Sequence, residues 1–160
     1  MKTRIFIIVA FLLACGNPSF AQEDSVITLP TITVTSTTEV PSIVNTALDR
    51  TFPDAFNLSW YKYDKDYLAR FIENDMDHNA LFKKNGVLKY DVSFGYESNL
   101  PENVLQMVQG AYPDHKIIRT FRVQEGGRDI WVVNLESLNN YVIARVEQDQ
   151  LEEVQRFNKS

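Results

Sequence analysis

The hydrophobic positions of the chain repeat twice with an offset of sixty residues. Residues 40–54 and 100–114 align without gaps, and each stretch opens on an apolar residue followed by proline and closes on an aromatic residue followed by Pro-Asp. Between these marks apolar residues recur at intervals of three and four, which places them on one face of a helix. Proline is tolerated in the first turn of a helix and cannot continue one. The pattern therefore predicts an amphipathic helix of about eleven residues at the start of each repeat.

After each helix the period of the pattern changes to two, which is typical of half-buried β-strands. Four such stretches occur in each repeat, at 56–61, 67–73, 78–84 and 87–94 and at 116–123, 129–136, 141–146 and 151–157. Asn85-Gly86 is the strongest hairpin signal, because both central residues of a type I′ turn need positive φ. We predict one α+β domain at 40–158, a tandem repeat (40–97 and 98–158) of a helix plus a four-stranded antiparallel sheet, with the helices on one face of the sheet.

The first twenty-one residues have the organisation of an export signal. Lys2 and Arg4 precede an unbroken apolar run of ten residues, and Ser19-Phe20-Ala21 supplies the small residues that a signal peptidase reads. The run is too short to span a bilayer, which needs about 20 apolar residues. We predict a signal peptide at 1–21, and a cut before a lipidated Cys15 is the alternative.

Residues 22–39 are rich in threonine and separate the export signal from the first helix. Their β-branched residues alternate as in an edge strand, but Pro30 and the lack of a partner hairpin favour an extended tether. We therefore predict a tether over 22–39. With the export signal, this organisation predicts a periplasmic or secreted protein, or a lipoprotein if Cys15 is the anchor.

The composition and the net charge of the chain exclude several classes of function. Hydrophobic residues make up 44% of the 160 residues and charged residues 23%, which is typical of a chain that builds a core. The net charge of −5 argues against a nucleic-acid partner, because such proteins carry a basic face. One cysteine excludes a disulfide framework and a multi-cysteine zinc site, and two histidines leave little material for histidine-based catalysis.

The sequence contains none of the common nucleophile, zinc or phosphate-binding motifs. Asp75-x-Asp77-x-Asn79 begins like a calcium loop, but the glycine at the sixth position and the glutamate at the twelfth are missing. His78 lies beside these acids, and the simplest interpretation is a solvated hairpin turn. We predict no enzyme, no catalytic residue, no metal site and no cofactor, and weak binding of an ion by the acidic turn stays open.

Short motifs spread over the repeats carry a resemblance to a known family. They are Phe52-Pro53-Asp54-Ala55, Trp60, Tyr67-Leu68-Ala69-Arg70-Phe71, Ala80-Leu81-Phe82 with Asn85-Gly86, and Leu100-Pro101. This layout resembles the PepSY-like proteins, small exported bacterial proteins that share a fold with the β-lactamase inhibitor protein (BLIP). The resemblance covers about residues 40–157 and implies an extracytoplasmic tandem α+β repeat with an inhibitory or ligand-binding role. It brings no catalytic residues, and BLIP is usually disulfide-bonded whereas this mature chain has no cysteine, so BLIP's target does not carry over.

Strand parity defines a candidate binding surface. If Phe56, Leu58 and Trp60 face the helix, the intervening residues of that strand face away, and the same holds for neighbouring strands. Tyrosine and arginine dominate contact energies at protein interfaces. The candidate binding residues on the uncovered sheet face are Tyr61, Tyr63, Arg70, Arg119 and Phe121.

These features predict a non-enzymatic extracytoplasmic binding module. It would act as an inhibitor or docking protein for another envelope protein through the uncovered sheet face. A small-ligand or metal-ion sensing module of the envelope is the alternative. The uncovered face could also be solvated or buried against a second copy, so the sequence is compatible with a monomer and with a dimer.

Overall fold

The computed structural model describes residues 39–160. The predicted signal peptide at 1–21, the alternative lipidation site at Cys15 and almost all of the predicted tether at 22–39 lie outside the described residues. No helix within the described part is long and apolar enough to cross a membrane.

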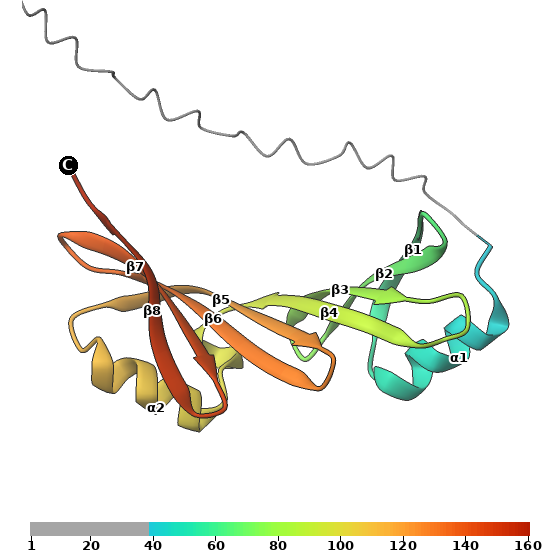
Figure 1. Cartoon of the computed structure of the whole chain (residues 1–160), viewed down its shortest axis with the longest axis horizontal. Helices are drawn as coiled ribbons and strands as arrows, with labels where there is room; N and C mark the ends of the chain where they lie inside the picture. Colours follow the sequence, from blue (N-terminus) through green and yellow to red (C-terminus); the bar gives the residue numbers. More distant parts are fainter. Residues whose placement is uncertain (1–38) are drawn as a thin grey trace, which may run out of the picture. The chain divides into compact units, whose positions relative to one another are not determined.

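The described residues form two successive units of one helix and four strands (Figure 1). The first unit consists of α1 (Ser42–Thr51), β1 (Phe56–Tyr63), β2 (Asp66–Glu73), β3 (Met76–Phe82) and β4 (Leu88–Gly95). A short 3-10 turn, η1 (Glu97–Asn99), leads into the second unit, which consists of α2 (Glu102–Ala111), β5 (Lys116–Glu125), β6 (Arg128–Glu136), β7 (Asn140–Glu147) and β8 (Gln150–Asn158). The predicted α+β fold is confirmed.

All the strands join in one antiparallel sheet, in the order β1 to β8. Within each unit neighbouring strands are connected by hairpins. Between the units, β4 and β5 are connected through η1 and α2 and still pair directly, over Tyr90–Gly95 and Thr120–Glu125. The two repeats therefore share one continuous sheet.

Tight turns set the register of the hairpins. Asn74 and Asp75 between β2 and β3 both have positive φ, as a two-residue type I′ turn requires. The hairpin predicted at Asn85-Gly86 is confirmed, but its turn type is different. Only Gly86 has positive φ (82°), and its N–H donates to the carbonyl of Lys83 at 2.9 Å. This is a three-residue loop closed by a glycine bulge rather than a type I′ turn.

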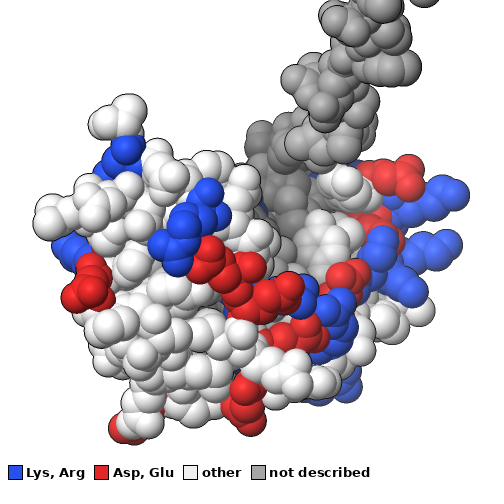
Figure 2. Space-filling model, turned by 60° about the vertical axis from the view of Figure 1, so that its left-hand side comes forward, with Lys and Arg blue, Asp and Glu red and all other residues white. Residues whose placement is uncertain are grey.

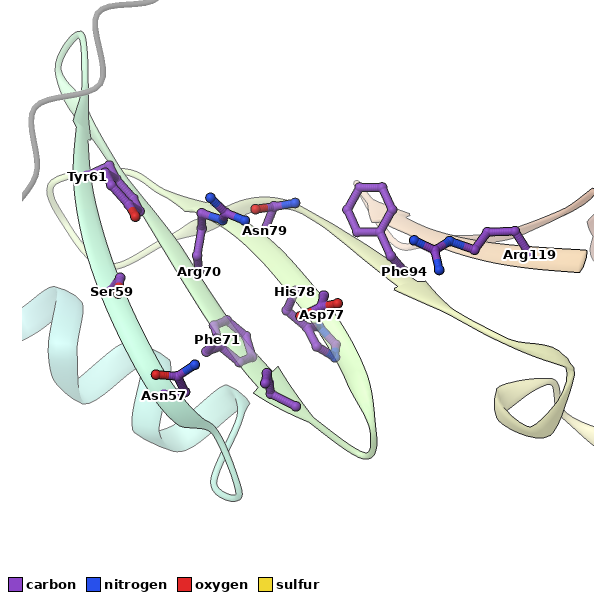
Figure 3. A pocket seen from close by; sticks show the side chains of 11 residues that line it. Asn57, Ser59, Tyr61, Arg70, Phe71, Asp77, His78, Asn79, Phe94 and Arg119 are labelled. Atoms are coloured by element: carbon purple, nitrogen blue, oxygen red, sulfur yellow. The ribbon is translucent and has the colours of Figure 1, made fainter.

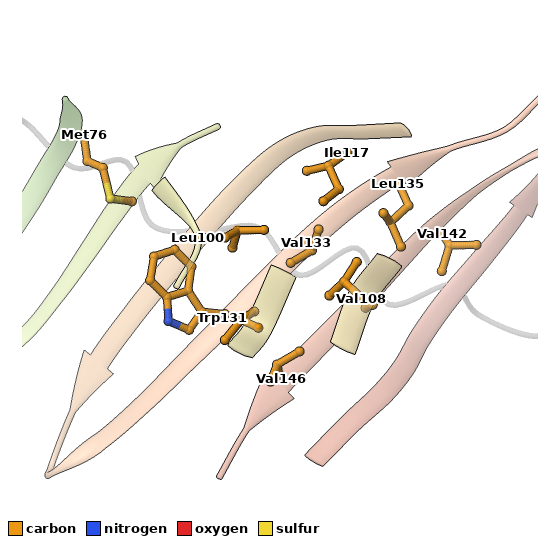
Figure 4. Packing of buried hydrophobic residues seen from close by; sticks show 11 residues of the cluster. Met76, Leu100, Val108, Ile117, Trp131, Val133, Leu135, Val142 and Val146 are labelled. Atoms are coloured by element: carbon orange, nitrogen blue, oxygen red, sulfur yellow. The ribbon is translucent and has the colours of Figure 1, made fainter. Parts of the chain in front are cut away.

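Both helices lie on the same face of the sheet (Figure 1). In the first unit, Val44 and Leu48 of α1 pack in a buried cluster with Phe71 and Phe82 of the sheet. In the second unit, Val108 of α2 packs in a larger cluster, whose labelled members in Figure 4 include Trp131, Val133, Leu135, Val142 and Val146. Each helix therefore covers the sheet of its own unit.

Between the two apolar clusters the helix side of the sheet is polar and yet buried. Asp91 and Ser93 of β4 and Thr120 of β5 have no exposed surface. Nδ1 of His78 in β3 lies 2.9 Å from Oδ2 of Asp91, and the imidazole stacks on Phe71 with ring centroids 4.9 Å apart. A polar pair therefore lies close to the middle of the sheet.

The interpretation of His78 as part of a solvated turn is wrong. Asp75 and Asp77 are exposed, as expected, but the turn has only two residues and β3 begins at Met76. This register turns His78 to the helix side, where only 7% of its surface remains exposed.

Loss of the His78 imidazole should destabilise the fold. His78→Ala leaves the buried Asp91 side chain without its hydrogen-bond partner, and a buried polar group left unsatisfied costs about 1–3 kcal/mol. Urea denaturation of His78→Ala, Asp91→Ala and the double variant measures the coupling, and the double variant should lose less than the sum of the single losses. Strictly additive losses would contradict a direct interaction.

Gly86 should tolerate a side chain poorly. An added Cβ would lie 2.9 Å from the backbone oxygen of Ile43 in α1, at a positive φ. We expect Gly86→Ala to lower the free energy of unfolding by about 1–3 kcal/mol. Gly110→Ala in α2 is the matched control, because its Cβ would meet nothing within 4 Å, and it should be neutral or stabilising by up to about 1 kcal/mol. Equal effects in denaturation would overturn this account of the hairpin.

Candidate functional site

The sheet face that points away from α1 and α2 is called the open face below. The cross-strand register defines it, because the buried residues Ala69, Thr120 and Val133 mark the helix side of β2, β5 and β6. By this register the open face contains all five predicted residues, Tyr61, Tyr63, Arg70, Arg119 and Phe121.

One part of the parity prediction is wrong. Asn57 has a φ of 55°, and the register of β1 shifts between Phe56 and Ser59. Trp60 packs against the α1 cluster as expected, but Phe56 is 56% exposed and Leu58 40% exposed. The bulge inserts an extra residue at the start of β1, so alternation counted from Phe56 fails there. Tyr61 and Tyr63 follow the bulge and keep their predicted side.

A hollow of about 390 Å³ lies on the open face between β1 and β5 (Figure 3). Tyr61, Arg70 and Arg119 line it, whereas Tyr63 and Phe121 lie outside its lining. In Figure 3 the Arg119 side chain extends from β5 towards the ring of Phe94. Strands from both units therefore contribute to one depression.

The two arginines of the hollow differ from most other arginines of the described chain. Four arginines form ion pairs with carboxylates at 2.6–2.7 Å, namely Arg122–Asp129, Arg128–Glu147, Arg145–Glu152 and Arg156–Glu153. Arg70 and Arg119 have no ion-pair partner among the described residues, and both are exposed. The Arg119 guanidinium instead lies over the ring of Tyr96, with Cζ 5.0 Å from the centroid. Their charges are therefore free to meet a ligand.

Outside the hollow, basic and acidic side chains pair with one another on the surface. On the side shown in Figure 2, basic and acidic side chains lie next to one another rather than in separate patches. Hydrogen bonds from Arg128 lower the pKa of Glu147, and hydrogen bonds from Arg156 lower the pKa of Glu153. These carboxylates are already compensated at neutral pH.

Half-buried apolar side chains continue the open face beyond the hollow. Phe121 packs edge-to-face on Phe94, with ring centroids 5.4 Å apart, and Phe94 lines the hollow. Partial burial, followed by the neighbouring Tyr63 phenol, raises the pKa of Tyr90 above its ordinary value, so Tyr90 stays a neutral donor. Further half-buried apolar residues on this side of β4 to β7 are Val92, Val123, Ile130, Val132 and Ile143.

Parity reasoning missed several residues that line the hollow. Asn79 and Phe94 share the open-face parity of the predicted strands at 78–84 and 87–94, so the signal was present in the sequence. Asn57 lies in the bulge, and alternation of residue types contains no signal for it. Asp77, also in the lining, was assigned to the acidic turn.

A second hollow of about 510 Å³ lies on the helix side, between the end of α1 and the start of α2. Phe52, Pro101 and Trp131 form part of its wall. Arg122 also lines it, but two hydrogen bonds of 2.8 and 2.7 Å to Asp129 occupy its guanidinium. Within residues 39–160 no group of three or more His, Cys, Asp or Glu side chains is placed to hold a metal ion.

The arginines of the open-face hollow should contribute little to folding. Arg70→Ala should change the free energy of unfolding by no more than about 0.5 kcal/mol, because an exposed side chain without an ion pair stabilises little. Arg119→Ala also removes the contact with the Tyr96 ring and should cost no more than about 1 kcal/mol. Leu135→Ala in the α2 cluster, where 1% of the side chain is exposed, should cost about 2–5 kcal/mol in the same denaturation assay. A loss at Arg70 comparable with that at Leu135 would assign the arginine a structural role.

Comparisons with known proteins bear on the fold. The sequence matches no protein-family model and no curated protein. A BLIP-like protein from Bacteroides fragilis has 15% identity and a TM-score of 0.57 over 76% of this chain and 88% of that chain. A DUF2874 family protein from Bacteroides uniformis has 18% identity and a TM-score of 0.53 over 75% of this chain and 90% of that chain.

A third solved structure, a candidate periplasmic protein from Bacteroides eggerthii, has 17% identity and a TM-score of 0.53. The match covers 76% of this chain and 90% of that chain. At such identities the likeness concerns the fold alone. The described chain has the BLIP-like fold, as its resemblance to the PepSY-like proteins implied.

Proposed function

We propose that this protein is a non-enzymatic binding module of the cell envelope that docks another envelope protein on its open face. The observation that carries the proposal is the hollow on that face, where Tyr61 lies together with two arginines that have no ion-pair partner within residues 39–160. Both helices pack on the other side, so the open face is available to a partner.

The composition of the open face supports a protein partner. Aromatic side chains and arginine dominate binding energy at protein interfaces, and half-buried apolar residues around them keep water out. Tyr61 lies in the hollow, and Phe121 joins the hollow to the apolar residues of β5 and β6 through Phe94. Aromatic and arginine residues surrounded by half-buried apolar residues are typical of a docking site.

The chemistry of the hollow supports binding rather than catalysis. Ser59 and Tyr61 supply its hydroxyl groups. His78 also contributes to the lining, but its Nδ1 contacts the buried Asp91, and neither hydroxyl is hydrogen-bonded to a histidine or a carboxylate within the described part of the chain. Activation of a hydroxyl nucleophile needs such a neighbouring base. The hollow therefore has the features of a recognition site.

An envelope location is part of the proposal. The predicted export signal at 1–21 would direct the chain out of the cytoplasm. The similar protein of Bacteroides eggerthii is described as a candidate periplasmic protein, which agrees with that direction. An inhibitory role, by analogy with the fold of BLIP, is the form of docking that we propose.

Site-specific photo-crosslinking in the native host tests the docking face. A benzophenone side chain introduced at Tyr63 or Phe121 should crosslink one and the same protein. The same group at Ile43, which is 54% exposed on α1, should not. The purified partner should then bind the purified protein, and Tyr61→Ala should weaken the complex at least about tenfold because interface tyrosines are frequent hot spots.

The control variant for this experiment is Leu138→Ala. Leu138 is 93% exposed at the β6–β7 hairpin, outside the lining of the hollow, and its loss should leave the affinity unchanged. Crosslinks that are equally strong at Ile43 would contradict the proposed face. Absence of any crosslinked protein, together with a rise in melting temperature on addition of Ca²⁺ or Zn²⁺, would favour the sensing alternative.

A further inference from the structure

We infer that the hollow of the open face receives a carboxylate side chain, Asp or Glu, of the partner protein between Arg70 and Arg119. The inference rests on the docking function proposed above and specifies its chemistry.

Two arginines that are distant in the sequence line the same hollow. Arg70 lies on β2 and Arg119 on β5, three strand spacings across the sheet and four residues along it, or roughly 20 Å between backbones. Both long side chains nevertheless line the same hollow of about 390 Å³ (Figure 3). A group bound in the hollow would therefore lie within reach of guanidinium groups from both repeats.

The charge balance makes these two arginines unusual. The chain has 21 acidic and 16 basic residues, so carboxylates are in excess. Four other arginines use such carboxylates in ion pairs. Arg70 and Arg119 have none within the described residues, although Asp77 also lines the hollow. Two arginines against one aspartate leave the lining with an excess of positive charge.

The surroundings of Arg119 prepare it for a planar anion. Its guanidinium carbon lies over the Tyr96 ring, 5.0 Å from the ring centroid, and its N–H groups have no ion-pair partner among the described residues. Guanidinium N–H groups form a fork that matches the two oxygens of a carboxylate. The amide of Asn79 and the phenol of Tyr61 add donors to the same hollow.

The neighbouring residues favour a side chain on a protein over a nucleic acid or a free ion. The net charge of −5 disfavours a polyanion such as nucleic acid. Phe94 and Tyr61 give the hollow aromatic walls, which suit the methylene groups that carry a carboxylate in Asp or Glu. The half-buried apolar residues beyond Phe121 would contact the chain around that residue.

Nuclear magnetic resonance with a minimal probe tests the inference. The purified exported protein, labelled with ¹⁵N, is titrated with N-acetyl-glutamate methylamide and separately with the uncharged N-acetyl-glutamine methylamide at low salt. The Nε–H signals of Arg70 and Arg119 should shift saturably with the glutamate probe and not with the glutamine probe. Arg50 on α1 is the internal control, because it is exposed, has no ion pair among the described residues and lies outside the hollow.

Matched variants complete the test. Arg70→Gln and Arg119→Gln should each weaken the glutamate probe about fivefold, as expected for an exposed ion pair, and raised salt should weaken it further. Equal shifts with both probes, an equally large shift at Arg50, or no shift at the two arginines would overturn the inference.

The same variants separate failure of the inference from failure of the docking proposal. If the crosslinked partner binds both variants as tightly as the unchanged protein while Tyr61→Ala loses it, docking stands and carboxylate recognition is wrong. If the glutamate probe binds but Tyr63 and Phe121 crosslink no protein, the occupant is a free small carboxylate, and the assignment to a partner side chain is overturned. Loss of the partner in both arginine variants, with saturable probe binding, supports the inference.

Discussion

The pairing of β4 with β5 is the constraint on which the rest of the structure depends. Each repeat is a helix on four strands, and alone it would leave an unpaired sheet edge where the other repeat begins. The six-residue ladder between these two strands merges both repeats into one sheet. Because the register continues through this ladder, α1 and α2 lie on one side and the other side stays uncovered across both repeats.

The same ladder explains why polar residues are buried near the middle of the sheet. The apolar clusters under α1 and α2 are separate, although Met76 of the first unit belongs to the α2 cluster. The strands between them turn Asp91, Ser93 and Thr120 towards the helix side. The contact between His78 and Asp91 satisfies part of this polar region. On the open side the same strands bring Arg119 from the second unit to the hollow that Arg70 lines from the first. Structure and proposed recognition therefore depend on one junction.

Much of this architecture follows from the sequence, because helix and strand periods and the sixty-residue offset are properties of residue order. The parity that groups Tyr61 with Tyr63, and Arg119 with Phe121, also follows, since alternation persists along the unbroken part of a strand. Alternation counted from Ile117 fails, because the register of β5 shifts between Ile117 and Arg119 and Ile117 is buried in the α2 cluster. The bulge at Asn57 does not, because a single inserted residue leaves no periodic trace. The burial of His78 depends on Asp91, thirteen positions away on another strand, and local pattern contains no information on that contact.

Hydroxyl-radical footprinting of the protein in intact cells, compared with the purified protein, tests the docking claim most directly. The account predicts protection of Tyr61, Tyr63 and Phe121 in cells, whereas Ile43 on α1 and Leu138 at the β6–β7 hairpin react equally in both samples. Protection at Ile43, or identical reactivity of the open-face aromatics in both samples, would contradict a partner docked on the open face.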